Sequence, residues 1–143
     1  MAWTFLTIPK QTLEDALPTF ASGGLPAVAV LAQSLQRTRA ATEALYLLMK
    51  HALDDLGYRR LEWKCDAANA RSMRAAERLG FLYEGTFRQH RIVKGRNRDT
   101  AWFSIIDAEW AAVRAALEAW LAPDNFDPDG DQLRRLQDIR AGL

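Results

Sequence analysis

Positively charged side chains gather in the middle third of this 143-residue chain. Residues 58–98 carry 11 lysines and arginines against 4 acidic residues, whereas residues 99–143 carry 4 against 9. Because the whole chain has a net charge of only +1, this concentration indicates an anionic partner. That partner is either a nucleic acid or a cofactor that bears phosphate groups.

A segment ahead of this basic stretch is suited to binding phosphate. The apolar run at 27–32 predicts a buried strand, although its periodicity also fits a helix. An amphipathic helix is predicted at 40–56. The connection at 33–41 would therefore end on the unpaired backbone amides of a helix N-terminus, where Arg37 and Arg39 could add guanidinium contacts.

Hydrophobic periodicity defines the elements that would position these residues. Residues 58–66 alternate as in a half-buried strand, and Asn69 can cap a second helix that Gly80 ends. Strand-like runs follow at 81–93 and 100–106, joined by a polar hairpin connection at 94–99, and a last helix is predicted at 107–121. This order predicts an α/β or α+β fold with helices packed on a mixed central sheet.

Composition narrows the class of protein. The chain is 49% hydrophobic and 26% charged, as expected for a globular domain. The single cysteine, Cys65, excludes a disulfide framework and a multi-cysteine zinc site, and we predict no metal site. No stretch of about 18 apolar residues suggests a membrane span, so we expect a cytoplasmic protein.

Two segments resemble the GNAT family of acyl-CoA N-acetyltransferases. Gln36-Arg37-Thr38-Arg39-Ala40-Ala41 resembles the Gln/Arg-x-x-Gly-x-Gly/Ala loop that opens the helix binding coenzyme A, with Arg39 where the family prefers glycine. Asn69-Ala70-Arg71-Ser72, followed by Leu79-Gly80-Phe81 and Glu84-Gly85, resembles the Asn-x-x-Ser … Leu-Gly-Phe-x-x-Glu-Gly block of the RimJ/RimL-like branch. Two motifs in the family's order are more specific than either one.

The resemblance implies acetyl-CoA as cofactor and a primary amine, either a protein N-terminus or a small molecule, as acceptor. The cofactor pyrophosphate would lie on the loop residues, which are Gln36, Arg37, Thr38, Arg39, Ala40, Ala41 and Thr42. The pantetheine arm would lie between strands 27–32 and 58–66, held by Asn69, with Ser72 near the sulfur as proton donor. Helix capping is the alternative role for Asn69 and Ser72.

The general base is not fixed by the motifs. Ala76 stands where many relatives have a catalytic tyrosine. His90 is the histidine nearest the expected cleft, and its ordinary pKa suits a general base. Glu62 on the strand at 58–66 is an equal candidate.

The domain plan predicted from the resemblance has three parts. Residues 1–34 form an irregular segment with one strand, residues 35–121 form the C-terminal part of a GNAT domain, and residues 122–143 form an acidic, weakly helical tail. GNAT domains normally have more strands before the coenzyme A loop, so we expect a shortened sheet. The resemblance leaves open whether such an enzyme is active or impaired. We also expect homodimer contacts through an exposed sheet edge at 27–32. The alternative function is a nucleic-acid-binding module with five cations around the hairpin, namely Arg88, Arg91, Lys94, Arg96 and Arg98.

Overall fold

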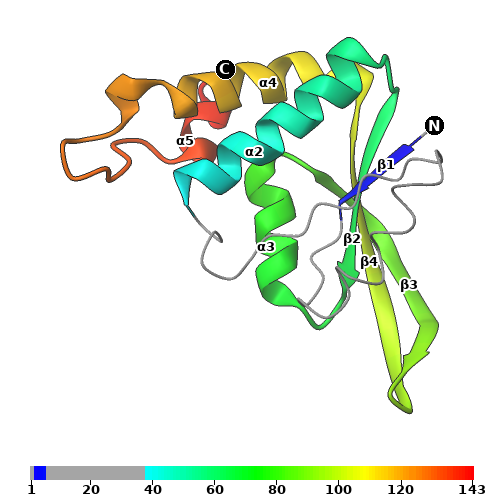
Figure 1. The fold of residues 1–143 in the computed structure, drawn as a ribbon. Coiled ribbons are helices and arrows are strands. Elements are labelled where there is room, and N and C mark those ends of the chain that lie inside the picture. Colours follow the sequence, from blue (N-terminus) through cyan, green and yellow to red (C-terminus); the bar gives the residue numbers. More distant parts are fainter. Residues whose placement is uncertain (1, 6–37) are drawn as a thin grey trace.

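The computed structural model describes residues 2–5 and 38–143. These residues form a four-stranded mixed sheet with helices against one face (Figure 1). The strand order is β1 (Ala2–Phe5), β2 (Arg60–Asp66), β4 (Arg96–Ile106) and β3 (Leu82–Val93). β1 is parallel to β2, and the other neighbouring pairs are antiparallel. The predicted α+β class, with helices packed on a mixed sheet, is confirmed.

Helix α2 (Arg39–Lys50) begins at a side-chain cap. Thr38 has extended backbone angles, and its Oγ1 accepts a hydrogen bond from Ala41 N at 3.1 Å. α2 continues into a short π-helix, η3 (His51–Asp55), and Gly57 follows with a φ of +64°. The helix predicted at 40–56 is therefore present, with a wider last turn than the periodicity indicated.

The second helix, α3 (Ala70–Leu79), lies between β2 and β3 in the chain. Asn69 caps its N-terminus by accepting a hydrogen bond from Ser72 N at 3.1 Å, and Gly80 ends it in the left-handed conformation with a φ of +102°. Both ends agree with the sequence prediction.

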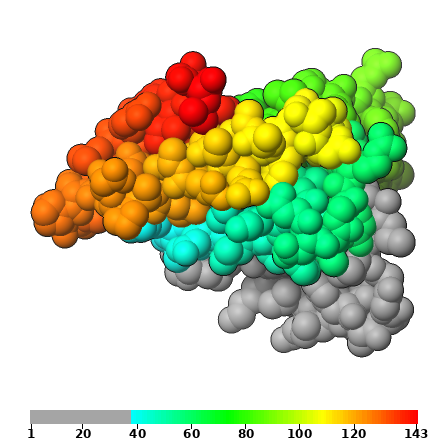
Figure 2. Space-filling view, turned by 90° about the horizontal axis from the view of Figure 1, so that it is seen from above, coloured from blue at the N-terminus to red at the C-terminus, as the bar shows by residue number. Residues whose placement is uncertain are grey.

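The C-terminal helices complete the layer. α4 (Asp107–Leu121) matches the predicted helix and packs between α2 and α5 (Leu136–Ala141) (Figure 2). A 3-10 turn, η4 (Pro123–Asn125), follows α4. None of the helices in the described part of the chain is long and apolar enough to cross a membrane.

The hydrophobic core fills the space between these helices and one face of the sheet. Leu61, Trp63 and Cys65 alternate inward from β2, as predicted. They meet inward side chains of β4 and of the helices. The largest fully buried side chains of this core are Phe103, Met49, Leu61, Ile105, Leu117 and Leu136.

The hairpin of β3 and β4 is tighter than predicted. The connection expected at 94–99 is only Lys94 and Gly95, whose φ values are +50° and +72°. Two successive positive φ values are typical of a type I′ turn, whose twist matches that of the flanking strands. The polar residues after Gly95 misled the prediction, because they alternate along an exposed extension of β4 rather than forming a loop.

Two expectations concern the N-terminal part. The strand predicted at 27–32, and the sheet edge expected there, lie outside the described residues. The strand that pairs in parallel with β2 is β1, in register from Ala2 opposite Arg60 to Phe5 opposite Trp63.

Candidate active site

The N-terminus of α2 is the part of the predicted coenzyme A loop that the structure describes. Thr38 caps the helix, Ala40 is exposed, and Ala41 and Thr42 are buried. Thr42 Oγ1 donates to Thr38 O at 3.2 Å, which closes the first turn. The loop residues Gln36 and Arg37 lie outside the described part of the chain.

Two arginines surround this helix start. Arg39 donates to Leu121 O at 2.7 Å, and its guanidinium lies 4.3 Å from the centre of the Phe126 ring. Arg78 on α3 donates to Thr42 Oγ1 at 3.1 Å and lies 4.8 Å from the Trp120 ring centre. Burial lowers the pKa of Arg78, but a guanidinium stays charged at any physiological pH. The α2 N-terminus therefore has positive charge on both sides.

The N-terminus of α3 holds the second predicted motif. Asn69 is exposed, while Ser72 in the first turn is buried between α3 and β2. Ser72 Oγ accepts a hydrogen bond from Trp63 Nε1 at 3.0 Å. Burial raises the pKa of the neighbouring Cys65 thiol, and a hydrogen bond with Ser72 partly offsets that effect. Ser72 thus links the α3 cap to the inward face of β2.

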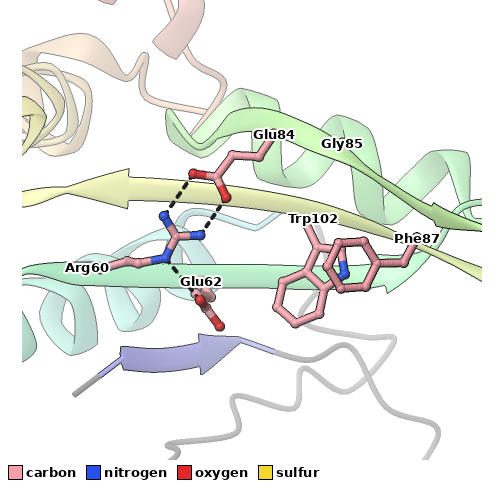
Figure 3. A pocket seen from close by; sticks show the side chains of 6 residues that line it. All are labelled: Arg60, Glu62, Glu84, Gly85, Phe87 and Trp102. Carbon is pink, nitrogen blue, oxygen red and sulfur yellow. Dashed lines mark hydrogen bonds and ion pairs between the residues drawn. The ribbon is translucent and has the colours of Figure 1, made fainter. Parts of the chain in front are cut away.

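The opposite face of β2 carries a cluster of charged side chains. Arg60 lies between Glu62 and Glu84: its Nε donates to Glu62 at 2.9 Å, and its two terminal nitrogens bind both oxygens of Glu84 (Figure 3). Ser104 Oγ donates to Glu84 at 2.7 Å. The hydrogen bonds from Arg60 and Ser104 lower the pKa of Glu84 to about 2, so Glu84 is ionised at neutral pH.

Aromatic rings continue this face beyond the charged cluster. The Phe87 and Trp102 ring centres are 5.1 Å apart (Figure 3). His90 lies edge-on to Phe87 at 5.5 Å, and its Nδ1 is 2.9 Å from Thr100 Oγ1. The structure therefore brings Glu62 and His90 to one face of the sheet, whereas Ser72 lies on the other.

One edge of β2 is paired along only part of its length in the described residues. β1 pairs only with residues 60–63 of this strand. Among the described residues, positions 64–66 of β2 have a partner strand on the β4 side alone. This half of the β2 edge is next to the Asn69 cap, which follows β2 directly in the chain.

Sequence reasoning missed several residues around these sites. Glu84 belongs to the quoted second motif and Arg78 directly precedes its Leu79-Gly80-Phe81 part, yet their partners, Arg60 and Thr42, are distant in sequence. Trp102 is only partly buried and lies on the face of the sheet opposite the helices, which we call the open face. The register of β4 against β2 places Trp102 opposite Lys64, which is on the polar side of the strand, and that parity was the available signal.

Comparison with known proteins decides the family. A sequence model of the acetyltransferase (GNAT) domain matches residues 22–82. The crystal structure of a GCN5-related N-acetyltransferase from Brucella melitensis is 56% identical in sequence, with a TM-score of 0.75 over 77% of this chain and 50% of that chain. The matched part of the chain, residues 22–82, is thus a segment of a GNAT domain. The matched range includes the segments at 36–42 and 69–72 that resemble the two motifs of the family.

Further relatives agree with this assignment. A crystal structure from Chromobacterium violaceum ATCC 12472, described as a probable acetyltransferase of the GNAT family, is 57% identical, with a TM-score of 0.55 over 57% of this chain and 40% of that chain. A Bacillus subtilis (strain 168) protein described as "Putative ribosomal N-acetyltransferase YdaF" is 32% identical over 69 residues, which are 48% of this chain and 38% of that protein. The chain spans half or less of the length of these relatives.

Proposed function

We propose that this chain takes part in acetyl transfer from acetyl-CoA to a primary amine. One observation carries the proposal. The capped N-termini of α2 and α3, which hold the motifs that resemble cofactor sites, lie on one side of β2, and a face with carboxylates and aromatic rings lies on the other. The phosphates of the cofactor would bind at the α2 N-terminus, where Thr38, Arg39 and Arg78 are close. The acceptor amine would approach from the side of Glu62.

The reaction needs a proton acceptor and a proton donor. The neutral amine attacks the thioester carbonyl carbon, the C–S bond breaks, and the sulfur leaves as a thiolate that takes up a proton. Glu62 is our candidate base, because its side chain is only about one-fifth exposed and lines a pocket on the open face of the sheet. His90 is on the same face and is the second candidate.

Ser72 and Asn69 complete the proposed site on the cofactor side. Asn69 is exposed next to the half of the β2 edge that has no described partner on one side, which suits contact with the pantetheine arm. Ser72 is our candidate donor to the thiolate. Its burial and its hydrogen bond with Trp63 mean that the cofactor sulfur would have to reach the α3 side of β2.

The first test is cofactor binding. At about 100 times its dissociation constant, acetyl-CoA should stabilise the fold by about 2.7 kcal/mol through mass action, which a thermal scan detects. Replacing Arg37 and Arg39 together with alanine should weaken binding, whereas Arg59→Ala, which removes one exposed positive charge elsewhere, serves as a control. The absence of both a thermal shift and a calorimetric heat at millimolar acetyl-CoA would refute cofactor binding.

A second function is favoured by the charge of the hairpin. Among its five cations, only Arg98 lies within 4.0 Å of a described carboxylate, that of Asp66. Binding of RNA or DNA through the free cations would weaken steeply with added salt, because phosphate contacts release counterions. A titration of a short RNA duplex at 50 and 200 mM salt tests this function, and equal affinities at both salt concentrations would exclude it.

A further inference from the structure

The open face of the sheet has a pocket that combines charge with aromatic surface. It has a volume of about 360 Å³ and is lined by Arg60, Glu62, Glu84, Gly85, Phe87 and Trp102 (Figure 3). One guanidinium and two carboxylates give these lining residues a net charge of −1, since Glu84 is ionised and Arg60 is the only cation among them. The pocket is thus matched in charge to a monovalent cation.

The two carboxylates differ in how much of their hydrogen-bonding capacity is used. Both oxygens of Glu84 are bound by Arg60, and Ser104 adds a third hydrogen bond. Glu62 uses only Oε1, which accepts from Arg60, and its Oε2 has no hydrogen bond to any other described residue. Glu62 Oε2 is therefore the oxygen in this pocket that can accept hydrogen bonds from a ligand cation.

Lys64 shows what kind of cation fits the aromatic side. It is two residues from Glu62 on β2 and directly opposite Trp102 in β4. Its Nζ lies 4.9 Å from the centre of the Trp102 ring. Within the described residues, Lys64 forms no ion pair. The Lys64 ammonium, which is carried on an unbranched alkyl stem, therefore already lies over the Trp102 ring, and no ion pair with a described carboxylate holds it there.

We propose that Glu62, Phe87 and Trp102 form a binding site for the ammonium end of a linear alkylamine, and that Lys64 occupies this site while it is empty of ligand. This inference rests on the proposed acetyl transfer and specifies its acceptor class: a primary amine on a flexible unbranched stem, as in a lysine side chain or an aliphatic diamine. The stem packs on Phe87 and Trp102, and the ammonium moves between the ring face and Glu62 Oε2. Lys64 competes with the acceptor for the ring.

Calorimetric titration of the full chain with n-pentylammonium, in the absence of acetyl-CoA, tests the inference. Binding should be weakened about 3- to 30-fold by Trp102→Leu, as expected for the loss of a cation–π contact, and also by Glu62→Gln. Lys64→Met should tighten binding, whereas Lys94→Met on the exposed hairpin should leave it unchanged. Phe87→Leu, at a side chain that is 56% exposed, provides a second ring variant if Trp102→Leu does not fold.

The outcomes separate this inference from the proposed function. Equal binding of the uncharged 1-pentanol, stronger binding of the α-amine of alanyl-alanine amide, or an unchanged affinity in Lys64→Met would each overturn the alkylammonium site. A thermal shift with acetyl-CoA in the same preparation would leave the acetyl-transfer proposal standing. Conversely, pentylammonium binding without any acetyl-CoA response would support the site and refute its use in acetyl transfer by this chain.

Discussion

The two faces of the sheet differ in what their side chains contact, although the same two central strands provide both. On the helix-covered face, Leu61, Phe103 and Ile105 are completely buried. On the open face, Arg60 and Glu62 of β2 and Trp102 of β4 are only partly buried. Because side chains alternate along a strand, the core residues and the candidate binding residues of β2 and β4 lie on opposite faces. Substitutions on the two faces should therefore separate effects on stability from effects on binding.

The largest difference is expected between two phenylalanines. Phe103→Ala empties a fully buried site and should destabilise the fold by about 3–5 kcal/mol. Phe87→Ala removes a ring that is 56% exposed and should cost less than about 1 kcal/mol while weakening the open-face pocket. Urea unfolding followed by circular dichroism measures both. Similar losses in the two variants would show that the open face is packed in solution as tightly as the helix face.

A smaller effect is expected at the end of α3. Gly80 has a φ of +102°, and a Cβ there would lie 3.1 Å from the Val113 side chain and 3.2 Å from Arg140 Nη1. Gly80→Ala should therefore cost about 2–3 kcal/mol, from backbone strain and from crowding of α4 and α5. Gly57 also has a positive φ, but open space surrounds it, so Gly57→Ala should cost only the strain of about 1 kcal/mol. Equal midpoints in denaturant for both variants would contradict the crowding.

Much of the fold could be predicted because its signals are local. The Asn69 cap, the Gly80 stop and the helix at Asp107–Leu121 are each determined by residues within a few positions of one another. The hairpin turn was misplaced because Arg96, Asn97 and Arg98 have loop-like composition, and only their pairing with residues 91–93 makes them a strand. Pairing across a sheet is not visible in the local sequence.

The candidate site was predicted only in part for the same reason. The motifs gave Asn69 and Ser72 directly, whereas Glu62 was one of two candidate bases on predicted strands. The register then placed Glu62 and Ser72 on opposite faces of the sheet. Arg60 and Glu84 are 24 residues apart, and no short-range pattern links them. Their contact depends on β3 lying beyond β4 in the sheet, which follows from the strand order and not from spacing.

Ser72 tests the connection between the two faces. Ser72→Ala removes the acceptor that Trp63 Nε1 uses, and we expect a loss of about 1–2 kcal/mol in the free energy of unfolding. If Ser72 also protonates the thiolate, kcat should fall more than the KM for acetyl-CoA rises, because that interaction acts mainly in the transition state. Ser104→Ala, which also removes a buried hydroxyl, is the matched control for the free energy of unfolding. Loss of stability with an unchanged kcat would restrict Ser72 to holding Trp63 against α3.

The smallest effect concerns acid and the open face. Glu84 has a pKa of about 2 in the folded chain, because Arg60 and Ser104 stabilise its charged form, whereas an unfolded glutamate has a pKa of about 4.3. A folded-state pKa below the unfolded value adds stability that is complete above about pH 5 and is lost as the pH falls toward 2. The Glu84 side chain is 42% exposed, so solvent screening limits this contribution to less than about 1 kcal/mol. Between pH 6 and pH 3, the urea midpoint should therefore fall slightly less in Glu84→Gln than in the unmodified chain. The control is Glu43→Gln, at an exposed site on α2, which should behave like the unmodified chain. A steeper fall in Glu84→Gln would mean that the Arg60 cluster does not favour the charged form of Glu84.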